Sequence, residues 1–224
     1  MADSSGVITS VEAQRRRSGR RCNVFVDGRY AFSVDARLAQ TLHVGRPLSG
    51  VGAAMLLSDD QRARCREAAI RFLAVRPRSE REIRRRLDQH GYPSVLVEAV
   101  VESLRGLDLI DDTAFARYWV EQRQTHRPRG ARLLKLELRR KGLDAEVAAE
   151  AVANMGDEGQ SAYQAAAGRA RILGGVDERT FRQRLGGFLQ RRGFDYESAS
   201  WAVNRLWDER SGGSECALRC AFRR

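Results

Sequence analysis

The side chains in this sequence that could support catalysis are few. Asp111 and Asp112 are an adjacent pair of carboxylates, which would be the catalytic acids if the protein were a metal-dependent nuclease. Neighbouring residues on a helix point apart, however, and no histidine, cysteine or further acid stands at the spacing of metal ligands. We therefore expect Asp112 or Thr113 to cap the start of a helix, where a side-chain oxygen accepts a backbone N–H.

The histidines and cysteines show no catalytic or metal-binding pattern. His43, His90 and His126 fall in expected loops or helix ends, each without an obvious partner. The four cysteines stand at irregular positions: Cys22, Cys65, Cys216 and Cys220. The CALRC spacing of the last two matches neither a zinc knuckle nor a redox C-x-x-C motif, and we expect incidental thiols. The sequence thus predicts a protein that is not an enzyme and that has no metal site and no cofactor.

Basic side chains are the remaining candidates for function, and they are densest between residues 123 and 142. The segment RQTHRPRGARLLKLELRRKG carries eight arginines or lysines and a single acid, Glu137. Cations on the outward side of a helix bind phosphate groups or acidic protein surfaces. An ordinary solvated surface is the alternative. The candidate binding residues are Arg123, Arg127, Arg129, Arg132, Lys135, Arg139, Arg140 and Lys141.

The whole chain is strongly basic, mainly through arginine. Its net charge is +11 over 224 residues, and its isoelectric point is about 10.4. Such an excess predicts a polyanionic partner, either nucleic acid or the acidic face of a protein that holds nucleic acid. A GC-rich genome would explain the high ratio of arginine to lysine but not the excess over 29 acids. Arginines at 15–17, 20 and 21 either contact nucleic acid or protect the edge of a strand.

The composition predicts a soluble globular protein, with 42% apolar and 31% charged residues. No stretch approaches the roughly 18 consecutive apolar residues that a membrane span requires. The N-terminal sequence MADSSGVITS has neither the basic nor the apolar region of a secretory signal. We therefore expect a cytoplasmic monomer with no membrane partner.

The basic segment lies within a helical pattern that occurs three times. Gly91, Gly142 and Gly193 are spaced 51 residues apart, and apolar residues stand four and eight positions before each of them. This spacing places the apolar residues on one face of a helix. The glycine is expected just after that helix, at a position where positive φ favours a residue without a Cβ. The complete pattern covers residues 83–104, 134–155 and 185–206.

A fixed period of this length predicts a helical repeat protein in which each unit packs on its neighbours. A further helix precedes each copy, around Phe72, Phe115 and Ala166, so each unit should hold three helices. Ser79 and Glu82 have the spacing of a capping box at the start of the first copy. The expected fold is mainly α, with three tandem three-helix units forming an elongated curved array and a small β-hairpin element at the N-terminus.

The first fifty residues predict the small β element. Asp27 and Gly28 lie between two apolar runs, which is the strongest short-range signal of a hairpin. A short helix capped by Asp35 should follow, and the long helices should begin near Ser58. The expected domains are a hairpin with a short helix at 1–57, helical repeats at 58–110, 111–158 and 159–210, and a disordered tail at 211–224.

The sequence resembles the RecX family of bacterial recombinase regulators at three places. They are AIRFLAVRPRSEREIRRRL in the first repeat, GLDLIDDTAFARYWVEQR at the following junction, and RGARLLKLELRRKGLDAEVAAEAV in the second repeat. The resemblance covers roughly residues 65–208. The segment ITSVEAQRRRSGRRCNVFVDGRYAFSVD is similar to an extension that some members carry. The glycine-rich opening of the third repeat, YQAAAGRARILGGVDERTF, and the cysteine-containing tail depart from the family pattern.

The resemblance implies an array of three-helix units without catalytic activity. Family members bind in the groove of the RecA filament on single-stranded DNA and restrain strand exchange, ATP hydrolysis and co-protease function, which affects DNA repair and the SOS response. Some members also bind DNA directly. The basic surface of the family's middle unit would correspond here to Arg129, Arg132, Lys135, Arg139, Arg140 and Lys141.

The expected partners are therefore the RecA filament and single- or double-stranded DNA, bound directly or through RecA. The alternative is a stand-alone DNA-binding protein in which the helix from Gly130 to Lys141 acts as a recognition helix.

Overall fold

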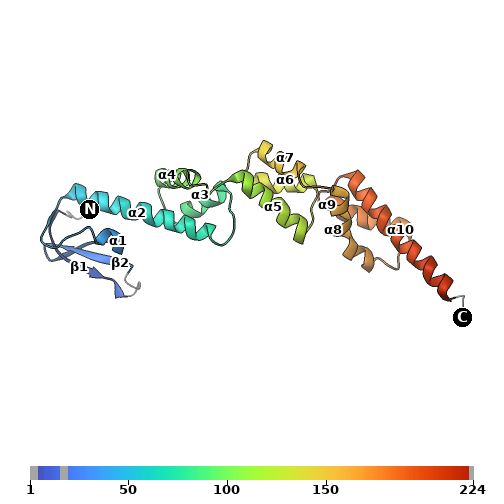
Figure 1. Cartoon of the computed structure of the whole chain (residues 1–224), viewed down its shortest axis with the longest axis horizontal. Helices are drawn as coiled ribbons and strands as arrows, with labels where there is room; N and C mark the ends of the chain where they lie inside the picture. The colour runs from blue at the N-terminus through green and yellow to red at the C-terminus, as the bar shows by residue number, and fades with distance from the viewer. Residues whose placement is uncertain (1–4, 16–19, 222–224) are drawn as a thin grey trace. The chain divides into compact units, whose positions relative to one another are not determined.

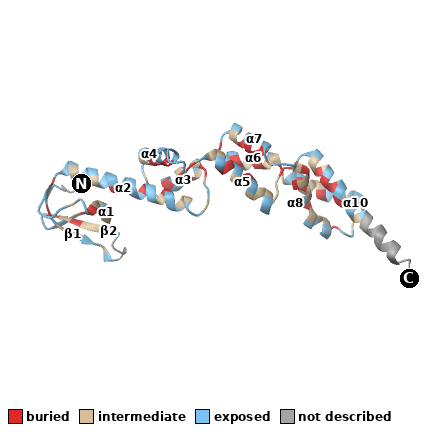
Figure 2. Cartoon of the chain, viewed as in Figure 1, coloured by how far each residue is buried: buried red, intermediate tan, exposed pale blue. Residues whose placement is uncertain are grey.

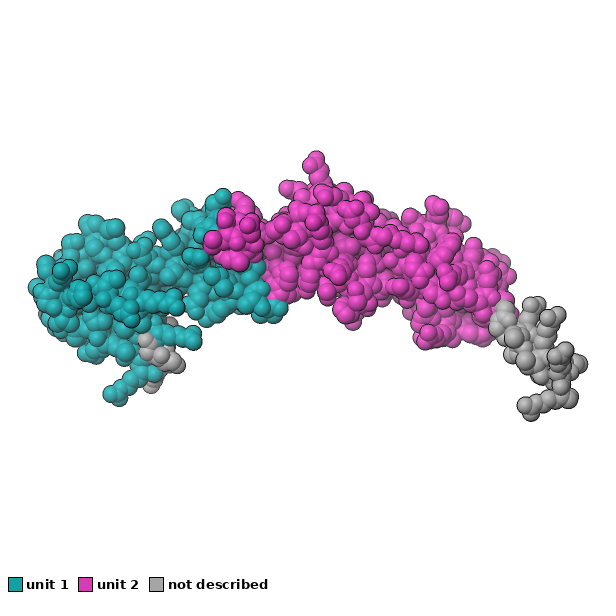
Figure 3. Space-filling view, viewed as in Figure 1, with its two compact units in different colours: residues 1–75, 86–103 teal, residues 76–85, 104–224 magenta. Residues whose placement is uncertain are grey.

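The computed structural model describes residues 5–15 and 20–221, with residues 212–221 described by their backbone alone. These residues form four strands and ten helices, drawn in Figure 1, which confirms a mainly α fold with a small N-terminal strand element. The chain divides into two compact units. Unit 1 comprises residues 1–75 and 86–103, and unit 2 comprises residues 76–85 and 104–224 (Figure 3).

The N-terminal part of unit 1 is an antiparallel sheet with the strand order β3-β2-β1-β4. Its strands are β1 (Gly6–Ala13), β2 (Arg21–Val26), β3 (Arg29–Asp35) and β4 (Pro47–Leu48). β2 and β3 form the predicted hairpin, in which Asp27 and Gly28 have φ values of 49° and 74°. Positive φ at both residues is what a type I′ turn requires. The sheet is larger than the predicted hairpin because β1 pairs with β2 and β4 pairs with β1.

Two helices pack on this sheet. α1 (Ala36–Ala39) is capped by Asp35, as predicted, and the carboxylate accepts a backbone N–H at 2.9 Å. α2 (Gly50–Leu73) begins well before Ser58, because the Ser49 hydroxyl accepts a backbone N–H at 3.0 Å and caps the helix there. Glycines in its first turn have poor helix propensity and conceal this start in the sequence. The boundary expected between residues 57 and 58 therefore lies inside a helix.

A buried ion pair fastens the sheet to α2. Asp60 is only 3% exposed, and its carboxylate lies 3.1 Å from the guanidinium of Arg21. The same carboxylate accepts a backbone N–H at the end of β3 at 2.7 Å. Arg21 thus stabilises unit 1 from within. Arg15 and Arg20 are exposed, and positions 16 and 17 lie outside the described residues.

The three repeats have the helices that the sequence predicts. α2 supplies the first helix of the first repeat. The remaining helices are α3 (Glu80–Gln89), α4 (Ser94–Arg105), α5 (Asp112–His126), α6 (Ala131–Arg140), α7 (Ala145–Ala153), α8 (Glu158–Ile172), α9 (Glu178–Arg191) and α10 (Tyr196–Ala221). Gly91, Gly142 and Gly193 follow the middle helices with φ values of 77°, 96° and 85°. The predicted role of these glycines at helix ends is confirmed.

Buried residues, red on the ribbon of Figure 2, follow the predicted apolar positions. Leu134 and Leu138 have no exposed surface in the core of the second repeat, and Leu185 and Leu189 have none in the core of the third. These pairs lie one turn apart on α6 and α9, so the middle helices use the predicted face. Trp201, on α10, keeps 41% of its surface exposed.

α10 extends beyond the apolar pattern of the third repeat. The sequence predicts disorder for residues 211–224, whereas the backbone is helical as far as Ala221 and residues 222–224 lie outside the described part. Helical backbone hydrogen bonds need no apolar face, so the missing periodicity of this stretch does not exclude a helix. Within residues 5–15 and 20–221, no helix has the length and apolar character needed to cross a membrane.

Within unit 2, equivalent hydrogen bonds to a backbone carbonyl join consecutive repeats. The Ser79 hydroxyl at the start of α3 donates to the carbonyl of Lys141 at the end of α6, at 2.7 Å. One period later, the Gly130 N–H at the start of α6 donates to the carbonyl of Arg192 at the end of α9, at 3.0 Å. Both partners move by 51 residues, so the contact between repeats follows the sequence period.

A carboxylate completes each of these junctions. Asp112 accepts the backbone N–H of Glu80 at 2.9 Å, and Glu158 accepts the backbone N–H of Ala131 at 3.0 Å. Each acid is the first residue of the following repeat's opening helix. The first N–H groups of a helix have no partner within that helix. The next repeat therefore caps α3 and α6, and we call each set of contacts a repeat junction.

The adjacent carboxylates Asp111 and Asp112 are explained by this arrangement. The predicted cap at Asp112 or Thr113 is wrong by one residue, because Asp111 accepts the N–H of Thr113 at 2.7 Å and caps α5. Asp112 is thereby directed to the preceding repeat. Burial raises the pKa of the Asp112 carboxyl above its ordinary value. The two acids cap two different helices.

Glycine is needed at the junctions for space as well as for φ. A Cβ at Gly193 would overlap the side chain and backbone of Leu133, and one at Gly142 would overlap the side chain of Arg81. A Cβ at Gly91 would meet no atom within 4 Å. The four-stranded sheet, and not a helical repeat, precedes the first repeat. Gly91 therefore ends a helix without taking part in a repeat junction.

Gly193→Ala should therefore destabilise the protein more than Gly91→Ala. Gly91→Ala forces an L-residue into positive φ, which costs about 1–2 kcal/mol. Gly193→Ala adds an overlap with Leu133, for which overpacking costs about 1–3 kcal/mol more. Urea unfolding of both variants and the unchanged chain measures the difference. Equal losses of stability would contradict the close approach at Gly193.

Candidate functional site

The exposed side of α6 carries half of the predicted binding residues. Arg132, Lys135, Arg139 and Arg140 are exposed there, and we call these four residues the α6 basic face. Arg132, Lys135 and Arg139 are three and four residues apart and therefore lie on adjacent turns, and Arg140 directly follows Arg139. Among the described residues, none of the four side chains has a hydrogen bond or ion pair. Arg127, at the end of α5, is exposed and without such a partner as well.

Arg123 and Arg129 are instead paired with the only acid of the segment. The side chain of Glu137 is 11% exposed, lies 2.9 Å from Arg123 and also pairs with Arg129. It accepts the indole N–H of Trp119 at 2.9 Å as well. The guanidinium of Arg123 stacks over the Trp119 ring, 4.3 Å from its centroid. These contacts fix α5 and α6 to each other.

Lys141 is also held by internal contacts. Its ammonium lies 2.6 Å from the carboxylate of Glu82 and 4.6 Å from the centroid of the Trp119 ring. Glu82 also receives Arg76 at 3.1 Å and completes the predicted capping box by accepting the N–H of Ser79. The three residues Arg123, Arg129 and Lys141 thus stabilise the second repeat, and the remaining five candidates face solvent.

Positive charge is in excess around the start of α6. Burial lowers the pKa of the Arg129 guanidinium below its ordinary value, and the neighbouring Arg123, Arg192 and Arg127 act in the same direction. Burial and Arg127 lower the pKa of Arg192 in the same way. Both arginines nevertheless remain charged, because the guanidinium is not deprotonated in proteins. The local excess of cations would attract an anionic partner.

The α6 basic face borders a cleft of about 580 Å³ within unit 2. Arg132 and Lys135 line it from α6, while Gln190, Phe194 and Tyr196 line it from the third repeat. The Tyr196 ring is 79% exposed. An exposed ring beside cations can stack on a base or on a partner side chain. No local sequence pattern indicates this cleft, because two segments some sixty residues apart form it.

The other chemically active residues of the sequence do not assemble. Within the described part of the chain, no group of three or more histidines, cysteines or acids could hold a metal ion. His90 contacts a backbone carbonyl through Nδ1 at 2.9 Å. Burial raises the pKa of the Cys65 thiol to about 11, so it remains protonated at neutral pH. The side chains of Cys216 and Cys220 lie outside the described residues.

The models of one protein family match four segments of the chain. The regulatory protein RecX N-terminal domain matches residues 6–46, and the first, second and third three-helix domains of RecX match residues 65–104, 111–152 and 157–203. The matches together span well over half of the sequence. The chain belongs to the RecX family. The resemblance carried by the sequence motifs is therefore confirmed.

Relatives and solved structures named for the same family agree with this assignment. Regulatory protein RecX of Amycolatopsis mediterranei (strain U-32) is 36% identical over 167 residues, which cover 74% of this chain and 94% of that protein. Regulatory protein RecX of Clostridium perfringens (strain 13 / Type A) is 27% identical over 207 residues, which cover 90% and 96%.

Two crystal structures show the same fold. A regulatory protein RecX superposes with a TM-score of 0.67 at 27% identity, over 88% of this chain and 98% of that one. RecX from Lactobacillus salivarius superposes with a TM-score of 0.60 at 22% identity, over 66% and 97%.

Replacement of Glu82 by glutamine tests the contacts that hold Lys141. Burial opposes ionisation of Glu82, but hydrogen bonds from Lys141 and Arg76 hold its pKa below the ordinary 4.5. A depressed folded-state pKa stabilises the protein at pH values above the unfolded-state pKa, and this stability is lost as the pH falls through the folded-state value. Glu82→Gln should therefore lower the free energy of unfolding by about 1.5–3 kcal/mol at about pH 7.

The difference between Glu82→Gln and the unchanged chain should shrink as the pH falls from about 7 through the folded-state pKa of Glu82, and disappear once the native carboxyl is protonated too. Urea unfolding over this pH range measures it. Glu146→Gln, on the exposed surface of α7, is the matched control and should change stability little at either pH. A loss that is the same at both ends of the range would show that Glu82 acts through packing and not through its charge.

Proposed function

We propose that this protein regulates a RecA-type recombinase by binding the recombinase filament on DNA through the α6 basic face. The proposal rests on membership of a family of regulatory proteins, together with four exposed cations on α6 that have no partner among the described residues. A filament on DNA presents phosphate groups and acidic protein surfaces side by side. Arginine binds both, because its planar guanidinium forms paired hydrogen bonds with phosphate and carboxylate.

Regulation of this kind needs binding and no chemistry. A bound protein shifts a filament between states only when it binds one state more tightly than the other. The proposed outcome is inhibition of strand exchange, of ATP hydrolysis and of co-protease activity, which would reduce recombinational repair and the SOS response. The protein is proposed to act in the cytoplasm, as a monomer, without catalytic residues or cofactor.

A stand-alone DNA-binding protein that inserts α6 into the major groove is the alternative function. Recognition helices contact base edges with residues at their N-terminal end. In α6 that end lies against the third repeat, because the Ala131 N–H binds Glu158 and a Cβ at Gly130 would overlap the backbone of Gly193. The exposed cations lie along the flank of the helix instead. This geometry favours contact with phosphates or acidic side chains over the reading of bases.

The proposal is tested by the ATPase activity of a RecA-type recombinase on single-stranded DNA, measured with increasing amounts of this protein. We expect inhibition at stoichiometric amounts. Arg132→Glu/Lys135→Glu/Arg139→Glu should raise the concentration needed for half inhibition about tenfold or more, equivalent to about 1.4 kcal/mol of binding free energy. The control Arg179→Glu/Arg184→Glu/Arg191→Glu carries the same charge change on exposed positions of α9.

Each result bears on a different part of the proposal. Absence of inhibition by the unchanged protein at stoichiometric amounts would refute regulation of the filament. Equal inhibition by all three proteins would exclude the α6 basic face as the binding surface. Sub-micromolar, sequence-specific binding to naked DNA in the absence of recombinase would favour the alternative function.

A further inference from the structure

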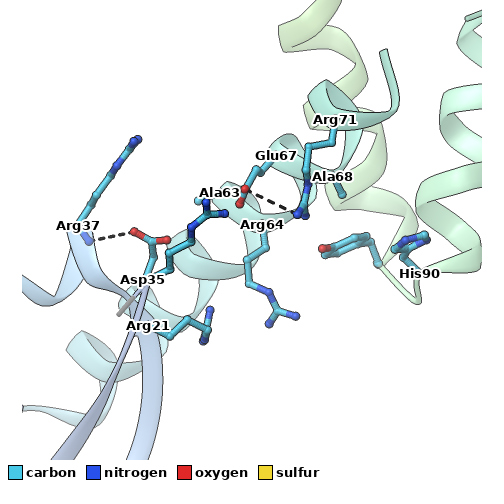
Figure 4. Close-up of a pocket in the computed structure, with 11 residues that line it drawn as sticks. Arg21, Asp35, Arg37, Ala63, Arg64, Glu67, Ala68, Arg71 and His90 are labelled. Carbon is cyan, nitrogen blue, oxygen red and sulfur yellow. Dashed lines mark hydrogen bonds and ion pairs between the residues drawn. The ribbon is translucent and has the colours of Figure 1, made fainter. Parts of the chain in front are cut away.

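Unit 1 has a second basic surface, which lines the cleft of about 1010 Å³ in Figure 4. Arg20 and Arg37 line it from the sheet and α1, and Arg64 and Arg71 line it from α2. The Arg64 side chain extends from α2 toward the side on which Arg21 lies (Figure 4). The side chains of Arg20 and Arg37 are exposed, and neither has a partner among the described residues.

The two arginines from α2 are only weakly paired. Arg64 is 52% exposed and lies 4.0 Å from Asp60, which already holds Arg21 at 3.1 Å. Arg71 is 68% exposed and lies 3.9 Å from Glu67, one turn away on the same helix. Exposed ion pairs at such distances contribute little to stability. Four guanidinium groups around the cleft are therefore available to an anion.

The spacing of these arginines matches a chain of phosphates better than a single ion. Arg64, Ala68 and Arg71 follow one another at four and three residues and lie on one face of α2. Arg64 and Arg71 are seven residues apart, which is about 10 Å along the helix axis. A single phosphate group cannot bridge that distance, whereas successive phosphates of a nucleic-acid strand can.

Two rings at the end of the cleft indicate which form of nucleic acid it fits. His90 is exposed and Tyr92 is half-buried, and both line the cleft from the turn between α3 and α4. Gly91 separates them with a φ of 77°, which reverses the chain there. Single-stranded sites combine a basic groove with rings on which unpaired bases stack. A duplex keeps its bases stacked inside and leaves such rings unused.

We propose that this cleft is a binding site for single-stranded DNA, in which the four arginines hold the phosphate backbone and the His90–Tyr92 turn receives a base. The site belongs to unit 1 alone and uses none of the residues of the α6 basic face. It goes beyond the proposed function, because it assigns the contact with a strand to named residues of unit 1. Asp35 and Glu67, the acids at the cleft, are outnumbered by its arginines.

The test is fluorescence anisotropy of a labelled oligothymidylate titrated with the full chain over a range of salt concentrations. The affected variant is Arg64→Gln/Arg71→Gln, which leaves the pair between Arg21 and Asp60 intact. The control is Arg62→Gln/Arg66→Gln, which removes the same charge from exposed positions of α2 that do not line the cleft. Thermal unfolding of both variants should match that of the unchanged chain.

Loss of two phosphate contacts should reduce the slope of log K against log salt by about 1.4 on single-stranded DNA. The control should keep the slope and lose less than about twofold in affinity. Its two arginines do not line the cleft, so their removal weakens only the long-range electrostatic attraction. Tyr92→Leu removes one of the two rings and should lower the affinity for the strand about fivefold or more, because base–aromatic stacking is lost.

Three outcomes would overturn the site. One is an unchanged affinity and slope for Arg64→Gln/Arg71→Gln, and another is an equal loss in the control. The third is stronger competition by a blunt duplex than by a single strand of the same length. The assay contains no recombinase, so its failure leaves the filament proposal standing, and failure of the ATPase experiment leaves this site standing.

Discussion

The constraint on which unit 2 depends is that a helix cannot satisfy its own first backbone donors. α6 shows this most clearly, because its N-cap is Gly130 and makes no side-chain hydrogen bond. A side chain there would overlap the backbone at Gly193, so close packing of the repeats excludes an ordinary cap. Glu158 and the Arg192 carbonyl from the next repeat supply the missing acceptors. The same contacts that complete the helix thus attach its neighbour.

The repeat junctions also explain how the charge is distributed. Glu158 is used at the start of α6, Glu137 at its middle, and Glu82 binds Lys141 beyond its end. Acids near α6 are therefore consumed by internal contacts, whereas Arg132, Lys135, Arg139 and Arg140 remain exposed. The positive charge of the α6 basic face therefore depends on the positions of the acids as much as on the number of cations. That surface stands at the centre of the function proposed for this RecX-family protein.

Sequence reasoning succeeded where a feature is encoded by neighbouring residues. The 51-residue period, the positive φ after each middle helix, the Asp27-Gly28 hairpin and the capping box at Ser79 are all local patterns, and the structure contains each of them. The start of α2 was missed because its glycines conceal the cap at Ser49. α8 forms despite a glycine-rich sequence, because Ala162 and Ala166 are fully buried in the core of the third repeat.

The candidate site was only partly predictable, since pairing joins residues that are far apart in the sequence. Nothing near Lys141 indicates that Glu82 lies 2.6 Å away, and the local sequence does not distinguish the paired Arg129 from the exposed Arg132.

Native-state hydrogen exchange at the Glu80 and Ala131 amides tests the repeat junctions most directly. We expect both amides to exchange as slowly as core amides, with Asp112→Ala accelerating the first and Glu158→Ala the second. Exchange at the rate of free helix ends in the unchanged protein would contradict the account.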